Sequence, residues 1–105
     1  MATPLSPEEL RRAAAELPGW ECEAEGLTRT YRFATFRAAL AYMVRAGFEA
    51  EELNHHPEWT NVYSRVVVRL RTHDAGDRVT AKDVALALRL DRIAAGEAAR
   101  EGGAP

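Results

Sequence analysis

The chain has little net charge, a single cysteine and no long run of apolar residues, and each absence excludes a class of protein. A net charge of −2 on 105 residues gives no strong electrostatic attraction to nucleic acid or to an anionic membrane surface. No apolar run approaches the roughly 18 residues that a membrane-spanning helix needs. Cys22 cannot form a disulfide within the chain, which favours a reducing compartment. The opening residues also lack the basic and apolar segments of a signal peptide. We therefore expect a cytoplasmic protein that binds neither nucleic acid nor membrane.

Length and composition indicate one folded domain. A chain of 105 residues that is 47% hydrophobic and 29% charged has the composition of a globular protein rather than of a disordered one. We expect a single domain over residues 1–105, with an ordered core at about residues 6–94. Residues 95–105 are mostly Ala, Gly and charged residues, and we expect this tail to be frayed.

Local patterns predict three helices and four strands. Ser6, Thr35 and Thr80 can each cap the amino end of a helix. Residues 20–33 and 59–72 are rich in residues that favour strands, and each segment contains a turn, so each predicts a hairpin. The order α-β-β-α-β-β-α contains a repeated ββα unit. It predicts an α+β fold in which helices cover one face of a single four-stranded antiparallel sheet.

The same patterns predict where elements end. We expect the first hairpin to turn at Gly26 and the second at Ser64-Arg65. The middle helix should end near Asn54, because the residue before Pro57 is pushed into an extended conformation. The last helix is apolar on two faces, so we expect it to bury one face against the sheet and the other against a partner subunit.

All three histidines of the chain, His55, His56 and His73, lie within 19 residues of one another. Histidine can both give and take a proton near neutral pH, so the cluster favours a site for general acid–base catalysis. Antiparallel pairing would return His73, at the exit of the second hairpin, to the level of His55 at its entry. Glu51 lies one helical turn before His55. Asp83 could cap the last helix, fix the tautomer of a histidine, or do both.

Two other interpretations of the histidines stay open. Each could be a surface or packing residue. They could also bind a metal ion, but adjacent residues of an extended segment point to opposite faces, so His55 and His56 cannot readily chelate one ion. A zinc site more naturally shows two histidines two apart on a strand or four apart on a helix. We expect no metal. We expect Trp59 to be a residue of the sheet, although it is close enough to the histidines to stack on a flat heterocyclic ligand.

These residues resemble the motifs of a known family. The matching segments are Glu51-x-x-x-His55-His56-Pro57-Glu58-Trp59-x-Asn61-Val62-Tyr63, Thr72-His73, Thr80-x-x-Asp83 with Leu86-Ala87, and Leu17-Pro18-Gly19-Trp20. Together they resemble the pterin-4a-carbinolamine dehydratase family over about residues 6–94. The resemblance implies the same α-β-β-α-β-β-α fold. It also implies a hydro-lyase that converts 4a-hydroxytetrahydropterin to quinonoid dihydropterin in tetrahydropterin recycling, with no metal or organic cofactor.

The resemblance further implies a role for each matched residue. The catalytic residues would be His55, His56 and His73, the supporting residues Glu51 and Asp83, and the substrate-binding residues Pro57 and Trp59. We expect His56 at the departing hydroxyl and His73 at the ring. The family forms dimers and dimers of dimers, so the expected partner is a second copy of the chain, as a homodimer or homotetramer. The alternative is a non-catalytic dimerisation or regulatory protein with the same fold.

One segment departs from the family pattern. The stretch from His73 to Asp83 is one residue longer than usual, and Asp77-Arg78-Val79 stands where a Gly-Leu pair is common. The conformation of this loop and the placement of Asp83 therefore have to come from the structure.

Overall fold

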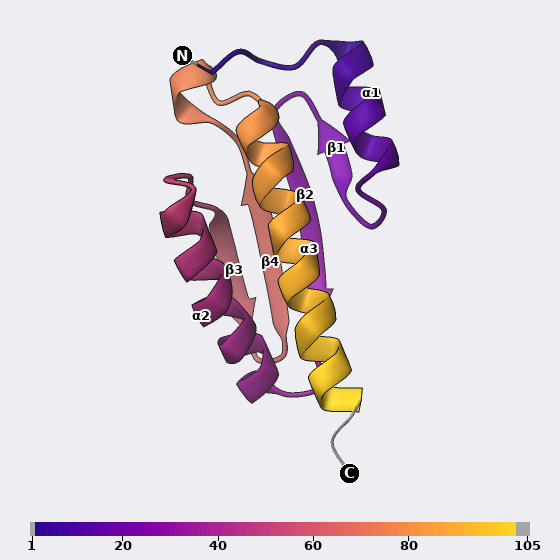
Figure 1. Cartoon of the computed structure of the whole chain (residues 1–105), viewed down its shortest axis with the longest axis vertical. Helices are drawn as coiled ribbons and strands as arrows, with labels where there is room; N and C mark the ends of the chain where they lie inside the picture. Colours follow the sequence, from indigo (N-terminus) through magenta and orange to yellow (C-terminus); the bar gives the residue numbers. More distant parts are fainter. Residues whose placement is uncertain (1, 103–105) are drawn as a thin grey trace.

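The computed structural model of the protein describes residues 2–102 and confirms the predicted α+β fold (Figure 1). The helical elements are α1 (Pro7–Ala15), α2 (Phe36–Glu52), α3 (Ala81–Gly102) and the short 3-10 turn η1 (His73–Ala75). The strands are β1 (Glu21–Glu23), β2 (Gly26–Arg32), β3 (Glu58–Val62) and β4 (Arg65–Leu70). The order α-β-β-α-β-β-α is the one that the local patterns predict.

The four strands form one antiparallel sheet in the order β1-β2-β4-β3. Helices α2 and α3 lie side by side across one face of this sheet, and α1 lies beside β1 (Figure 1). The prediction that helices cover one face is therefore confirmed. No helix in the described part of the chain is long and apolar enough to cross a membrane.

The hydrophobic core lies between the sheet and the two long helices. Alternate residues of the central strands point into it, as expected for a sheet with one buried face. The fully buried core side chains include Leu27, Tyr42, Val66, Val68, Leu70, Leu86 and Leu90. Burying a large apolar side chain contributes about 1.5–3 kcal/mol, so this layer fixes how α3 lies against β2 and how α2 lies against β4.

The helices begin at the predicted caps. The Glu9 N–H donates to Ser6 Oγ (3.1 Å), and the Ser6 N–H donates to Glu9 Oε1 (2.9 Å), which completes a capping box. Thr35 Oγ1 accepts from the Ala38 N–H at 3.1 Å. Both caps supply acceptors to N–H groups that have no partner within their own helix.

Both hairpin turns lie earlier than predicted. The first turn occupies residues 24–25, and Gly26 is already in β2, paired with Glu23. A Cβ at Gly26 would lie 2.8 Å from Arg69 Nε, so a larger residue here would displace the flexible end of the Arg69 side chain. The second turn occupies residues 63–64, where Tyr63 takes a positive φ of 52°.

Helix α3 includes the first part of the segment that we expect to be frayed, and fraying of that segment stays a prediction. Helix α3 continues to Gly102, because the Ala-rich segment has high helix propensity and because Glu97 is buried, with its Oε1 3.9 Å from Arg45 Nε on α2. Residues 103–105 of the predicted tail lie outside the described residues. Val84 and Leu88, on the second apolar face of α3, are half-buried and line a groove shared with α1, while the predicted subunit contact on this face stays a prediction.

Candidate active site

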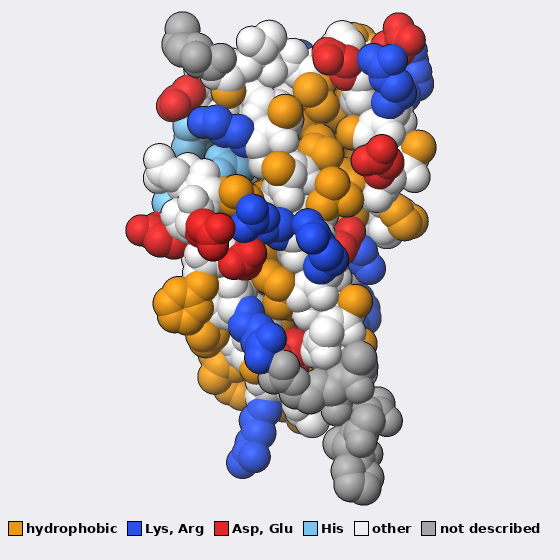
Figure 2. All heavy atoms as spheres, viewed as in Figure 1, with side chains coloured by type: hydrophobic (Ala, Val, Ile, Leu, Met, Phe, Trp, Pro, Cys, Tyr) orange, Lys and Arg blue, Asp and Glu red, His pale blue; other side chains and the backbone are white. Residues whose placement is uncertain are grey.

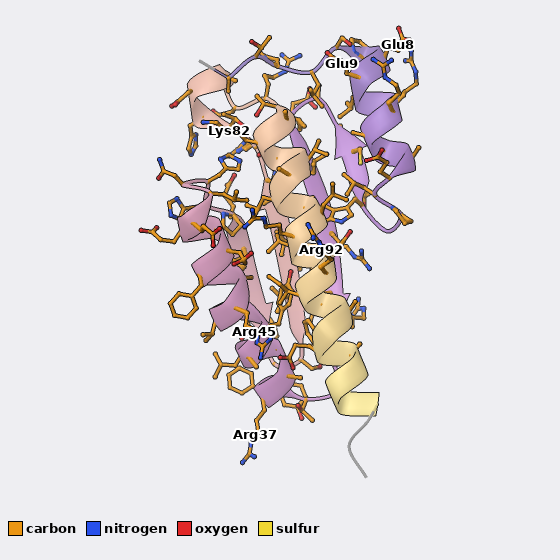
Figure 3. The ribbon with its side chains drawn as sticks, viewed as in Figure 1. Glu8, Glu9, Arg37, Arg45, Lys82 and Arg92 are labelled. Atoms are coloured by element: carbon orange, nitrogen blue, oxygen red, sulfur yellow. The ribbon has the colours of Figure 1, made fainter. Side chains whose placement is uncertain are left out.

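Three segments meet at one end of the sheet and enclose a cavity of about 220 Å³. They are the exit of α2, the end of β4 with η1, and the start of α3. The cavity is lined by Asn54, His55, His56, Arg71, Thr72, His73, Asp74 and Lys82. Figure 2 shows histidine side chains gathered at this corner of the molecule, and Figure 3 shows Lys82 at the amino end of α3, beside the η1 loop. The three histidines, separated by up to 18 positions in sequence, are thus brought together as predicted.

The exit of α2 is a Schellman motif that sets the direction of the histidine segment. Asn54 has a φ of 51°, a left-handed conformation that asparagine tolerates better than most residues. The His55 N–H donates to Ala50 O, and the Asn54 N–H donates to Glu51 O, both at 3.0 Å. These bonds satisfy the last carbonyls of α2 and confirm that the helix ends just before Asn54.

The His55 imidazole is paired with a carboxylate in the protein interior. His55 Nε2 lies 2.5 Å from Asp83 Oδ1, and the two side chains are 11% and 0% exposed. A carboxylate accepts hydrogen bonds, so Nε2 carries the proton and Nδ1 is left as the second ring nitrogen. Although the loop before α3 is one residue longer than in the family pattern, Asp83 lies beside a histidine.

The second oxygen of Asp83 fixes the carboxylate in place. Oδ2 accepts from the Thr72 hydroxyl and from the Thr80 N–H, each at 2.8 Å. The Thr72 and Thr80 hydroxyl oxygens are also 2.7 Å apart. Asp83 is therefore a helix cap and a histidine partner together, so both sequence interpretations hold.

Sequence reasoning missed Thr72 as part of this site. A signal was present, because the buried positions of β4 alternate through Val68 and Leu70, and Thr72 extends that series with a polar side chain. A polar residue at a position that should point into the core needs a hydrogen-bond partner. Here that partner is the Asp83 carboxylate.

The other two histidines also have carboxylate partners, but on the surface. His56 Nε2 lies 2.8 Å from Glu51 Oε1, whereas the helical spacing of the sequence connected Glu51 to His55. His73 Nδ1 lies 2.5 Å from Asp77 Oδ1, a partner that the sequence did not indicate. Exposed pairs of this kind contribute only about 0–1 kcal/mol to stability.

The two predicted substrate-binding residues lie outside the lining of this cavity. Trp59 is in β3, directly opposite Val68, and its half-buried ring packs against the core. Pro57 is half-buried in the segment that leads into β3. Arg71, which does line the cavity, donates from Nε to Glu58 Oε2 at 2.6 Å. Contact of Trp59 and Pro57 with a substrate stays a prediction.

Within residues 2–102, no group of three or more His, Cys, Asp or Glu side chains is placed to hold a metal ion. The chemistry that the cavity can perform with its own side chains is proton transfer. An imidazole held by a carboxylate has one fixed N–H and one nitrogen available to a ligand.

Fold and site together define an α+β protein with a histidine-lined cavity where a helix end, a strand end and a helix start converge. Residues 3–93 match the model of the pterin 4 alpha carbinolamine dehydratase family. The chain belongs to this family.

Individual relatives agree with the family match. The chain is 58% identical over 93 residues to a protein of Opitutus terrae, which covers 89% of this chain and 96% of the relative. It is 52% identical over 94 residues to a protein of Afipia carboxidovorans, with 87% and 92% covered. Both carry the name "Putative pterin-4-alpha-carbinolamine dehydratase". The crystal structure of a transcriptional coactivator/pterin dehydratase from Brucella melitensis matches with a TM-score of 0.81 at 39% identity, over 86% of this chain and 97% of that one.

Proposed function

We propose that this protein removes water from 4a-hydroxytetrahydropterin to give quinonoid dihydropterin, by histidine acid–base catalysis, in tetrahydropterin recycling. The observation that carries the proposal is the convergence of His55, His56 and His73 on one cavity, each paired with a carboxylate. The family membership supports the choice of a pterin as the substrate.

The reaction needs two proton transfers. The bond from C4a to the hydroxyl oxygen breaks, and that oxygen leaves as water after it receives a proton. The proton on ring N5 is removed as the C4a–N5 double bond forms. We assign the first transfer to His56 and the second to His73, whose Nε2 is left as the proton acceptor when Nδ1 is bound by Asp77.

The proposal requires no cofactor, because the loss of water changes no overall oxidation state. We assign neither transfer to His55, because its side chain is 11% exposed, against 60% for His56 and 79% for His73. We assign it to holding the ring plane of the substrate, with Nδ1 as the available nitrogen. Substrate contact by Pro57 and Trp59 belongs to the same proposal.

The test is an assay of 4a-carbinolamine dehydration measured against the spontaneous rate. His56→Ala and His73→Ala should each lower turnover by about 10²–10⁴. Both residues are exposed, so the circular dichroism spectrum and melting temperature should stay close to wild type. Near-wild-type turnover in both variants would exclude the mechanism.

We further propose that the protein self-associates, as a homodimer or homotetramer, through the outer side of α2. Four apolar side chains spaced by four residues, Phe36, Leu40, Val44 and Phe48, are between 41% and 72% exposed. Figure 2 shows hydrophobic side chains along this side of α2. A second copy presents the same stripe and can cover it by symmetry. Leu40→Glu should yield a smaller species in sedimentation, whereas an unchanged mass would remove the proposal.

The same exposed stripe favours the alternative of a regulatory or dimerisation partner without catalysis. That alternative predicts that removing all three imidazoles has no effect on the biological role of the protein. A cytoplasmic location, expected from the single cysteine, is part of both proposals.

A further inference from the structure

The loop after β4 reverses direction because two consecutive residues adopt left-handed backbone conformations. Gly76 has a φ of 72° and Asp77 a φ of 59°. Glycine adopts this conformation at no steric cost, and aspartate is among the few other residues that tolerate it. The reversal returns the Asp77 side chain to the start of the loop, at His73.

Thr72 closes the base of this loop. Its N–H donates to Arg78 O at 3.0 Å, and its carbonyl oxygen accepts from the Asp77 N–H at 3.1 Å. The hydroxyl of the same residue donates to Asp83 at 2.8 Å. The position of Asp77 is therefore tied by backbone hydrogen bonds to the residue that also holds the His55 partner.

The contact between the two side chains selects one tautomer of His73. Asp77 Oδ1 lies 2.5 Å from His73 Nδ1, and a carboxylate can only accept, so Nδ1 carries the proton. In the neutral ring this leaves Nε2 without a proton. A ring that lines the cavity in this tautomer presents an acceptor for a proton of the substrate.

We propose that Asp77 is a positioning residue for His73, which holds the imidazole in the Nδ1–H tautomer so that Nε2 accepts the substrate proton. This proposal rests on the proposed dehydration, because that reaction identifies the proton as the one on ring N5 of the substrate. The orientation of the ring, however, is a property of the protein without substrate and can be measured separately.

The His73–Asp77 pair is exposed, so its effect should be measurable in turnover and in the ring tautomer rather than in stability. The His73 and Asp77 side chains are 79% and 50% exposed. A surface pair contributes little to stability, so removal of the carboxylate should alter turnover and ring tautomer without altering folding. A purely structural role for Asp77 would give the opposite result.

The backbone conformation allows a clean set of variants. Asp77→Gly removes the carboxylate and accepts the positive φ without strain. Asp77→Asn keeps an acceptor oxygen at the same place and also tolerates this backbone region. Glu21→Gln, an exposed carboxylate on β1, is the control for loss of one negative charge elsewhere.

Two measurements on these variants test the proposal. In steady-state kinetics, Asp77→Gly should lower kcat about tenfold and leave KM unchanged. Tenfold is the lower end of the range of activity losses expected when the partner that orients a functional residue is removed. Asp77→Asn should restore most of this loss, and Glu21→Gln should match wild type. In nitrogen-15 NMR of the histidine rings, wild type should show the Nδ1–H tautomer of His73, and Asp77→Gly should show a mixture.

The outcomes separate this proposal from the proposed function. If wild type catalyses dehydration but Asp77→Gly changes neither kcat nor the tautomer, the positioning role is wrong. If Asp77→Asn loses as much activity as Asp77→Gly, orientation by a hydrogen bond is also wrong. If wild type shows no dehydration while Asp77→Gly still changes the tautomer, the proposed function fails and the orientation of His73 by Asp77 stands.

Discussion

Asp83 and Asp91 of helix α3, eight residues apart, each accept hydrogen bonds from other parts of the chain. Asp83, in its first turn, binds His55, Thr72 and the backbone of Thr80. Asp91, two turns later, has a different set of donors: Trp20 Nε1 at 3.0 Å, Arg29 NH1 at 2.8 Å and the Tyr31 hydroxyl at 2.5 Å. The two arrangements are alike in geometry and differ in the chemistry of their donors.

The donors decide what each cluster can do. An imidazole changes its proton occupancy near neutral pH, and the one at Asp83 lines a cavity with two others. Indole, guanidinium and phenol groups keep their protons at neutral pH. Burial, followed by the Tyr42 and Asp91 side chains, raises the pKa of Tyr31 far above its usual range. The Asp91 cluster therefore ties β2 to α3 and does no proton transfer.

The largest difference between the clusters should come from removal of Asp83. Asp83→Ala leaves His55 without its partner, and loss of an orienting carboxylate costs about 10–100-fold in activity. Because Asp83 is fully buried, the His55 and Thr80 N–H groups left without their acceptor should also lower the free energy of unfolding by about 1–3 kcal/mol. Turnover of the folded protein and urea denaturation check the two effects. Wild-type turnover in a folded Asp83→Ala protein would contradict the account.

The matched substitution at the other cluster should affect stability alone. Asp91→Ala removes the shared acceptor of Trp20, Arg29 and Tyr31, which should cost about 1–3 kcal/mol of the free energy of unfolding. Turnover per folded molecule should equal that of wild type. If Asp91→Ala lowered turnover as much as Asp83→Ala, the distinction between the clusters would be lost.

The Asp91 cluster also predicts a loss of stability in alkali. The raised pKa of Tyr31 keeps its proton in the folded state, whereas the unfolded chain releases it near pH 10. The unfolded state then binds fewer protons, so stability falls as the pH rises, by about 1.4 kcal/mol per pH unit for one group above about pH 10. Tyr31→Phe should flatten this decline between pH 9 and 11, and Tyr63→Phe, at an exposed turn, should retain it. Equal slopes in wild type and Tyr31→Phe would overturn the prediction.

A smaller and sharper comparison removes one donor from each carboxylate. Thr72→Val deletes a hydroxyl that donates to Asp83, and Trp20→Phe deletes an N–H that donates to Asp91. Each should lower the free energy of unfolding by about 0.5–1.5 kcal/mol. Only Thr72→Val should also reduce kcat, because only that donor holds a partner of a cavity histidine. A reduced kcat in Trp20→Phe, measured on folded protein, would show that the clusters are not independent.

Much of the fold could be predicted because its signals are local. The capping residues Ser6 and Thr35 and the alternation around Leu27 and Val68 determine element order and the buried face without any long-range information. The second turn was displaced because Tyr63 adopts a left-handed conformation that its residue type does not favour. The burial of Glu97 in the last part of α3 comes from packing, which composition does not show.

The site was only partly predictable, because some of its contacts depend on the three-dimensional course of the backbone and not on local sequence patterns. The spacing of Asp83 from Thr80 indicated a cap, whereas the spacing of Glu51 indicated His55 and not its observed partner His56. Asp77 reaches His73 only because Gly76 and Asp77 are both left-handed, and no sequence period encodes that arrangement. The two helical carboxylates were thus accessible to sequence reasoning, although the histidine that pairs with Glu51 was not, and the loop carboxylate Asp77 was missed.

The most direct test of the account is the rate of 4a-hydroxytetrahydropterin dehydration with wild type and with the triple variant His55→Ala/His56→Ala/His73→Ala, each measured against the spontaneous reaction. We predict a clear acceleration by wild type that the folded triple variant loses. No acceleration by wild type, or the same acceleration by the triple variant, would contradict the assignment of proton transfer to the histidine cavity.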